Sequence, residues 1–402
     1  MNRQPVIVAT ARSPIGRAYK GSLKDMRPDD LAAAVVRALL AKVPQLDPGE
    51  IEDLMLGCAQ PAGEQGYNIA RVVAVLAELY GVPGTTVNRY CSSSLQTIRM
   101  AAHAIAAGEG DVFVAGGVEC VSRFVHGKAD GMENTKNPVF PSERSTLYGT
   151  EGAPEWRPAE GLPDMYMGMG LTAENVASFM RVSREDQDAF AALSQQRAVA
   201  AQESGFFDAE ITPITLPDGS VAAKDDGPRA GTTAEKLGQL KPVFRADGTV
   251  TAGNACPLND GAAAVLVMSA ERAEALGIRP LARIVSSAVS GLDPEIMGLG
   301  PVAASEQALR RAGLTIDDID LVEMNEAFAA QVVASARKLG ISYDRLNVHG
   351  GAIALGHPFG MTGARIMTTL LHGLEARGGR YGLETMCVGG GQGMAMIVER
   401  LG

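Results

Sequence analysis

The stretch VNRYCSSSLQTI, residues 87–98, sets the arrangement that we expect for the rest of the chain. Cys91 stands before three serines, and apolar residues then recur at helical spacing: Leu95, Ile98, Ala102 and Ile105. Gly108 ends the pattern, so the sequence predicts a helix with Cys91 at its N-terminus. The unpaired amides and the helix dipole at that end favour the thiolate, which would make Cys91 a nucleophile near neutral pH. The alternative is that Cys91 is a small buried filler.

Length and charge limit the class of protein. The chain has 402 residues, of which 46% are hydrophobic, so we expect about two to three packed units. The net charge of −10 argues against nucleic acid or an anionic membrane as the main partner, although local amides and cations can still bind an anionic small molecule. Residues 1–4 lead directly into an apolar strand pattern, so we expect no signal peptide, and no stretch reaches the length of a membrane span.

The cysteines and histidines indicate free thiols and no metal. The five cysteines are scattered, with no C-x-x-C pair: Cys58, Cys91, Cys120, Cys256 and Cys387. An odd, scattered set fits a reducing compartment, and we expect a cytoplasmic protein. The five histidines show no metal-ligand spacing, so we assign no metal: His103, His126, His349, His357 and His372.

Strand and helix patterns alternate in the first part of the chain and again in the last. Helical patterns cover residues 29–43 and 70–80, and apolar strands are predicted at 54–57 and at 112–115, the latter ending in two glycines. The same order returns later, with a helix at 305–312, a turn and strand at 314–322, a helix ending near 374, a glycine turn and a strand at 384–388. The pattern predicts an α/β protein with an internal duplication, the alternative being two unrelated α/β units.

The segment between residues 121 and 249 has a different character. Prolines, glycines and charges interrupt it, and only one long helix is clear, at residues 184–203, with Ser183 as its N-cap. We expect an insertion that lies over the sheet and carries substrate contacts. The predicted division is therefore residues 1–120 plus 250–275 as a first half, 121–249 as the inserted domain, and 276–402 as a second half.

Four polar or glycine-rich loops carry the candidate chemistry: the Cys91 turn, residues 325–329, residues 349–363 and residues 387–393. Equivalent loops of a duplicated fold converge near its pseudo-twofold, so we expect the Cys91 and His357 loops to face one another. A thiolate nucleophile needs a base, and a histidine on a facing loop is the usual one. The alternative for His357 is a packing role.

Cys387 and Asn325 are the remaining candidates. Cys387 precedes three glycines, whose exposed amides can stabilise an enolate or an oxyanion, although a tight hairpin and core packing are the alternatives. Asn325 can orient a water or donate to an oxyanion, or it can be a helix cap.

Taken together, these loops resemble the four signature loops of the thiolases, the acetyl-CoA acetyltransferases and 3-ketoacyl-CoA thiolases. They read NRYCSSS at 88–94, NEAF at 325–328, GGAIALGHP at 350–358 and CVGGG at 387–391. The resemblance covers essentially the whole chain, including the central insertion. It implies the thiolase fold: two duplicated βαβαβαββ halves in a five-layered αβαβα sandwich, with an inserted loop domain that binds coenzyme A.

The resemblance also implies roles for individual residues. Cys91 would be the acylated nucleophile, His357 its base, and Cys387 the group that moves the proton at the α-carbon of acetyl-CoA. Asn325 would hold a water that forms one oxyanion hole with His357, and the amides of Cys91 and Gly389 would form the other. Contacts to coenzyme A and the acyl chain are implied for Arg229, Ala255, Cys256, Met169, Met297, Ala327 and Phe328.

Some positions depart from the family pattern. Cys256 replaces a serine that contacts the pantetheine arm, and Pro257 follows it in place of a common glycine. Gly168 replaces the histidine of the short-chain biosynthetic members, and His349 stands where asparagine is usual. These departures leave the reaction intact and leave the acyl chain length open.

The predicted activity is that of an acyl-CoA:acetyl-CoA C-acyltransferase, which reversibly cleaves 3-ketoacyl-CoA through an acyl-Cys91 intermediate, as in fatty acid β-oxidation. Coenzyme A is then a substrate, no cofactor is bound permanently, and a homodimer or homotetramer is implied. The alternatives are a short-chain biosynthetic acetoacetyl-CoA thiolase, a decarboxylating ketosynthase, which Cys387 disfavours, and a non-catalytic acyl-CoA or lipid-binding protein of the same fold.

Overall fold

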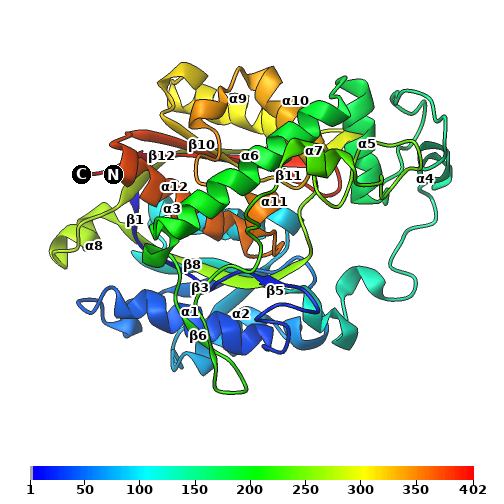
Figure 1. Ribbon diagram of the computed structural model, residues 1–402. Coiled ribbons are helices and arrows are strands. Elements are labelled where there is room, and N and C mark those ends of the chain that lie inside the picture. Colours follow the sequence, from blue (N-terminus) through cyan, green and yellow to red (C-terminus); the bar gives the residue numbers. More distant parts are fainter. Residues whose placement is uncertain (1–2) are drawn as a thin grey trace.

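The computed structural model describes residues 3–402 and has five layers, αβαβα (Figure 1). Two helices cover the outer face of one sheet, two lie between the sheets, and two cover the outer face of the other sheet. In this order the pairs are α1 (Pro28–Ala41) and α2 (Ile69–Leu76), α3 (Ser93–Ala107) and α12 (Thr362–Arg377), and α9 (Gly300–Ala312) and α10 (Ala329–Leu339). The layers and the two similar halves agree with the expected fold class.

The first sheet has the strand order β1-β8-β5-β3-β4. Its strands are β1 (Pro5–Arg12), β3 (Asp53–Gly57), β4 (Gly84–Val87), β5 (Val112–Cys120) and β8 (Asn259–Ser269). Strand β3 pairs in parallel with β4 and β5, whereas β8 pairs antiparallel with β5 and β1. Strands β5 and β8 are buried along their whole length and consist of apolar or small residues, except for Glu119 near the end of β5 and Asn259 and Asp260 at the start of β8.

The second sheet has the order β10-β11-β12-β9 and is joined to the first only where β9 pairs with two residues of β1. Its strands are β9 (Ala282–Gly291), β10 (Leu321–Met324), β11 (Tyr381–Val388) and β12 (Gln392–Arg400). As in the first sheet, the strands that pair in parallel are connected through helices: here these are β10 and β11. The other two pairs, β11–β12 and β12–β9, are antiparallel.

Several predicted bounds are corrected by tertiary packing. Strand β5 runs on through Gly116 and Gly117 to Cys120, because neighbouring strands on both sides complete its ladders. The last long helix runs from Thr362 to Arg377, three residues beyond the predicted end near 374, and a single short turn, α11 (Ala352–Leu355), precedes it. Strands β4, β9 and β12 and helix α10 were not predicted.

Residues 121–249 lie mostly over one edge of the sandwich and contain α4 (Glu143–Tyr148), α5 (Met169–Phe179), α6 (Arg184–Glu203), α7 (Ala234–Gly238) and the hairpin β6–β7 (Ile214–Thr215 and Val221–Ala222). Helix α6 has the predicted bounds, and Ser183 caps it in a reciprocal capping box with Asp186. Helix α5 was missed. The domain boundaries stay a prediction. Within residues 3–402, no helix is long and apolar enough to cross a membrane.

Candidate active site

The N-termini of the two middle helices meet at the centre of the molecule. Helix α3 follows a 3-10 turn, Tyr90–Ser92, which carries Cys91, and α12 follows the turn that carries His357. The Ser94 hydroxyl accepts a hydrogen bond from the Ala364 amide at 2.9 Å, so the first turns of both helices are tied together. Gly363 permits this approach, since a Cβ there would lie 2.4 Å from the Leu95 nitrogen. The Cys91 turn and the His357 loop are therefore neighbours, as the duplication predicts.

The expectation of a lowered pKa at Cys91 is wrong for this structure. Cys91 does lie next to the N-cap residue of α3, Ser92, but burial raises the pKa of its thiol to about 11. The amides of Gly389 and of Cys91 itself act in the opposite direction, and the Glu119 carboxylate raises the pKa slightly further. Desolvation exceeds the effect of the helix terminus, so the free protein holds Cys91 as the thiol.

His357 is held neutral in one tautomer. It is 1% exposed, and its burial, together with the nearby Arg365, lowers the pKa of the imidazole to about 3. The Thr362 hydroxyl donates to the Pro358 carbonyl at 2.8 Å, so it accepts from His357 Nδ1 at 2.6 Å. The proton therefore lies on Nδ1. The lone pair of Nε2 faces the side-chain amide of Asn325, which donates to it at 3.3 Å.

Asn325 is fixed at the end of β10, where its backbone amide donates to the Thr385 carbonyl at 3.0 Å. Its side-chain Oδ1 is fully buried and has no hydrogen-bond partner among residues 3–402. A buried acceptor without a partner is costly in a structural role and suits a site that binds a polar group.

Cys387 lies fully buried near the end of β11. It packs in one apolar cluster with six of its neighbours: Ala173, Val250, Ala255, Met297, Ala327 and Phe328. Burial raises the pKa of its thiol well above the usual value, and Cys91 and Cys256 raise that pKa further. The Cys256 thiol, with a pKa raised to about 12 by burial, is also influenced by Cys91. Three of the five thiols thus gather at one place.

The predicted substrate contacts fall into two groups. Ala255, Met297, Ala327 and Phe328 lie in the cluster with Cys387, and Cys256 lies beside them because its amide donates to the Ala327 carbonyl at 3.0 Å. Met169 is 37% exposed, and its sulfur lies 3.8 Å from the position of a Cβ at Gly389. Arg229 is not part of this cluster: it is exposed, and the Gln195 side chain holds its backbone by accepting the Arg229 amide at 2.8 Å.

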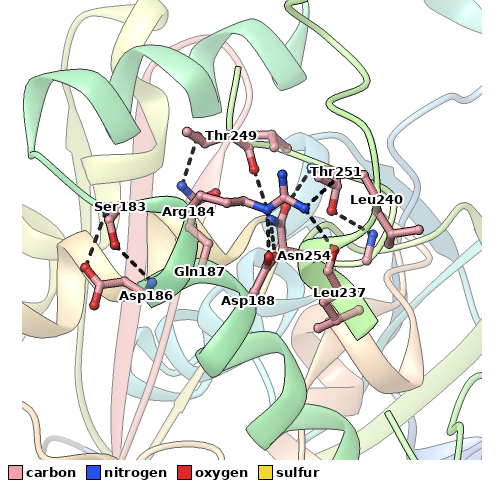
Figure 2. A network of polar contacts seen from close by, with 12 residues as sticks. Ser183, Arg184, Asp186, Gln187, Asp188, Leu237, Leu240, Thr249, Thr251 and Asn254 are labelled. Atoms are coloured by element: carbon pink, nitrogen blue, oxygen red, sulfur yellow. Dashed lines mark hydrogen bonds and ion pairs between the residues drawn. The ribbon is translucent and has the colours of Figure 1, made fainter. Parts of the chain in front are cut away.

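A polar network at the start of α6 holds the segment that carries Ala255 and Cys256 (Figure 2). Asn254 accepts the Thr251 amide at 2.8 Å and donates to Asp188 at 2.9 Å and to the Thr249 carbonyl at 3.1 Å. Asp188 also receives Arg184 at 2.6 Å. An ordered insertion helix therefore fixes the backbone that runs past the thiols.

The sequence reasoning missed three buried polar residues that support the loops. Thr362 orients His357, and Asn259 accepts the His357 amide at 3.0 Å. Glu326 accepts Ser194 at 2.6 Å, Asn347 at 2.8 Å and the Ile353 amide at 3.0 Å, which joins the Asn325 loop to the His357 loop. Glu326 stood inside a quoted motif, but only the fold shows what its carboxylate contacts.

These groups give the site a thiol, a neutral imidazole whose Nε2 lone pair faces the Asn325 amide, a second buried thiol and the amides of Cys91 and Gly389, which act on the first sulfur. Such a set can transfer an acyl group to sulfur and protonate or deprotonate a carbon acid. Within residues 3–402, no three His, Cys, Asp or Glu side chains are placed to hold a metal ion.

Comparison with known proteins gives one consistent family. Residues 5–271 match the family model "Thiolase, N-terminal domain" and residues 278–400 match "Thiolase, C-terminal domain". The chain is 48% identical to the 3-oxoadipyl-CoA/3-oxo-5,6-dehydrosuberyl-CoA thiolase of Escherichia coli strain K12 (99% of this chain, 100% of the other). It is 45% identical to the 3-ketoacyl-CoA thiolase of Bacillus subtilis strain 168 (99% of each chain). The crystal structure of the Bacillus anthracis acetyl-CoA acetyltransferase matches over 100% of both chains, with a TM-score of 0.87 and 40% identity.

Proposed function

The chain belongs to the thiolase family and is an acyl-CoA C-acyltransferase that cleaves 3-ketoacyl-CoA by thiolysis, and we propose that Cys91, His357 and Cys387 carry the reaction. Asn325 and the amides of Cys91 and Gly389 then stabilise the oxyanions.

In the cleavage direction, His357 Nε2 takes the Cys91 proton as the sulfur attacks the 3-keto carbon. The carbonyl oxygen becomes an oxyanion, which collapses to break the Cα–Cβ bond and leaves an acyl group on Cys91. The Cys387 thiol gives its proton to the α-carbon of the departing acetyl-CoA enolate. Coenzyme A then attacks the acyl-Cys91 carbonyl, and its thiol proton restores the protonation of the site.

The single observation that carries this proposal is the protonation of the Cys91–His357 pair. Burial keeps Cys91 as a thiol, with a pKa of about 11, and leaves His357 neutral, with a pKa of about 3 and its lone pair on Nε2. A nucleophile that begins protonated needs a base that begins unprotonated, and both are present on adjoining loops.

We propose that the substrate is a 3-ketoacyl-CoA longer than acetoacetyl-CoA and that the physiological direction is degradation. Gly168 supports this, because it stands where the short-chain biosynthetic members have a histidine. A Cβ at Gly168 would meet no atom within 4 Å, so packing does not require a glycine there, and the absence of the histidine is not forced by the backbone. A dicarboxylic chain is the second candidate, since a relative named for 3-oxoadipyl-CoA is 48% identical to this chain. The inserted domain at residues 121–249 would bind coenzyme A, with Arg229 on the adenine.

The test is a thiolysis series that follows the loss of the ketoacyl enolate absorbance with free coenzyme A. Acetoacetyl-CoA, 3-ketohexanoyl-CoA and 3-oxoadipyl-CoA are the key members, because the last two share a chain length and differ at the terminal carboxylate. A higher kcat/KM for either than for acetoacetyl-CoA supports the proposal. Activity confined to acetoacetyl-CoA would indicate a short-chain enzyme, and binding without acylation of Cys91 would indicate a non-catalytic protein.

We further propose a homodimer, or a tetramer built from dimers, in the cytoplasm. The outer edge of β4 pairs with no strand among residues 3–402, and two exposed tyrosines flank α2, the helix before it: Tyr67 (98% exposed) and Tyr80 (68% exposed). Five free cysteines suit a reducing compartment. Light scattering that gave a mass near 41.9 kDa would contradict the oligomer.

A further inference from the structure

Glu119 is a buried carboxylate to which the reaction described above assigns no role. It lies on β5, is 0% exposed, and receives four N–H groups: the amides of Ala59 (2.8 Å), Gln60 (3.2 Å) and Gly360 (3.0 Å) and the Gln65 side chain (2.6 Å). None of these donors is a cation. Burying a carboxylate that only neutral donors hold has a desolvation cost, because no cation compensates its charge. Burial accordingly raises the pKa of Glu119 to about 7.

The four donors come from both halves of the fold. Ala59, Gln60 and Gln65 belong to the first half, whereas Gly360 lies three residues after His357. Gly360 is inserted against the ends of β3 and β5, since a Cβ there would lie 2.4 Å from the Val118 carbonyl oxygen and 2.7 Å from that of Gly57. Glu119 therefore anchors the His357 loop to the first sheet.

The same carboxylate is linked to the Cys91 turn. One of its oxygens receives Gly360 and Ala59, and the Ala59 carbonyl accepts from the Asn88 side chain at 3.1 Å. The other end of that side chain, Asn88 Oδ1, accepts the Tyr90 amide at 2.8 Å. Tyr90 directly precedes Cys91 and has a strained φ of 43°. An unbroken chain of hydrogen bonds thus connects the loop of the base with the turn of the nucleophile.

We propose that Glu119 is a positioning residue that sets the His357 loop against the Cys91 turn. The inference rests on the proposed roles of these two residues. It goes beyond them because it assigns the relative placement of nucleophile and base, which come from different halves of the chain, to one carboxylate. A displacement of about 1 Å in such a pair costs roughly a hundredfold in rate.

The charge of Glu119 and its hydrogen bonds affect Cys91 in opposite directions, which makes the proposal testable. The charge raises the pKa of Cys91, so a residue that acted through charge alone would make Cys91 more reactive when neutralised. A residue that places His357 would make Cys91 less reactive. Glu119→Gln keeps the shape, removes the charge and turns an NH₂ group toward groups that are themselves donors.

The experiment measures kcat, KM and the rate of Cys91 alkylation by iodoacetamide at pH 7. For Glu119→Gln we expect kcat and the alkylation rate to fall about 10- to 100-fold, with KM within twofold of wild type. In a His357→Ala background the same substitution should add no further loss, because the residue that it positions is absent. Faster or unchanged alkylation, or an undiminished loss in the His357→Ala background, overturns the proposal.

A control separates positioning from a general loss of stability. Asp320→Asn removes a carboxylate that accepts the amides of Arg380 and Tyr381 at 2.8 Å each, at the opposite end of β11 from Cys387. It should leave kcat within twofold of wild type. If Glu119→Gln does not fold, Asn88→Ala breaks the same chain at an exposed residue and should lower kcat about tenfold. Wild-type kcat in folded Asn88→Ala would then overturn the proposal.

Hydrogen exchange distinguishes failure of this inference from failure of the proposed function. The peptide containing Gly360 should exchange at least about tenfold faster in Glu119→Gln than in wild type, because the amide of the variant keeps one acceptor oxygen where the carboxylate offers two to the four N–H donors. That readout needs no turnover. A wild-type protein without thiolysis would reject the proposed function, whereas unchanged exchange at Gly360 would reject the role of Glu119.

Discussion

Replacing Thr362 with valine should impair His357 without changing the shape of the site. The Thr362 hydroxyl accepts the Nδ1 proton of His357 at 2.6 Å and is itself fully buried. Valine has nearly the same volume but no acceptor. In the variant, the Nδ1–H group of His357 would be buried without a partner.

The magnitude follows from that lost partner. A buried donor left unsatisfied costs about 1–3 kcal/mol, so the Nδ1–H tautomer is destabilised by about 2 kcal/mol. The competing tautomer carries its proton on Nε2, which the free Oδ1 of Asn325 can accept after a rotation of its amide. That tautomer has no lone pair for Cys91. A 2 kcal/mol bias corresponds to about a thirtyfold fall in the rate of acylation.

The assay is the single-turnover rate of Cys91 acylation, followed by rapid quench and mass spectrometry. KM should stay within about twofold, because the buried Thr362 hydroxyl already has both its partners in His357 and Pro358. Thr362→Ser keeps the hydroxyl and serves as the matched control, with an expected rate within about threefold of wild type. Nitrogen-15 spectra of the imidazole should show the proton on Nδ1 in wild type and a shift toward Nε2 in the valine variant.

Two results would refute this reasoning. Acylation by Thr362→Val within twofold of wild type would mean that the hydroxyl does not fix the tautomer. An equal loss in Thr362→Ser would mean that packing of the methyl group, and not hydrogen bonding, supports His357.

Three further predictions concern the thiols and the loop packing. The pKa of His357 is lowered to about 3 and that of Cys91 is raised to about 11, so between these values the pair stays a thiol and a neutral imidazole. Since His357 would take the thiol proton during alkylation, the iodoacetamide rate should be flat from about pH 5 to 9 in wild type, whereas in His357→Ala only the thiolate reacts and the rate should rise about tenfold per pH unit. A wild-type rate that rises tenfold per unit would rule out His357 as the base. Cys387→Ala should still accept an acetyl group from acetyl-CoA, yet cleave 3-ketoacyl-CoA about 10²- to 10⁴-fold more slowly, and near-normal turnover would remove its assigned role. Gly117→Ala should lower the melting temperature and kcat together, because its Cβ would lie 1.9 Å from the Gly360 carbonyl oxygen. Gly81→Ala is the control and should change neither, because a Cβ there would meet no atom within 4 Å. Equal melting temperatures of the two variants would contradict the packing of Gly117 against Gly360.

The reactivity of the site depends on burial more than on the helix terminus. Cys91, Cys256 and Cys387 all have raised pKa values; Cys91 raises the pKa of the other two, and Cys256 also raises that of Cys387. Two or more thiolates in this space would repel each other in a medium of low dielectric constant. In the proposed reaction protons therefore have to move within the site, and the neutral imidazole of His357, with its lone pair on Nε2, is the group that we propose takes the Cys91 proton.

Local patterns in the sequence determined much of the architecture. Helix α6 and its Ser183 cap, the end of α3 at Gly108 and the repeated order of elements were all predictable, because helical periodicity, capping and glycine stops act over a few residues. The four loops could be named as candidates for the same reason: unusual residues stand at the ends of predicted elements.

The tertiary structure decided what those local patterns left open. The sequence placed Cys91 at a helix terminus and so predicted a lowered pKa, but the pKa is raised, because burial by residues distant in the chain dominates. The tautomer of His357, the gathering of three thiols and the bridge from Glu119 to Gly360 all depend on groups that lie far apart in the sequence. Desolvation and hydrogen-bond geometry are set by the three-dimensional neighbours of a group, and a linear pattern reports only its neighbours along the chain.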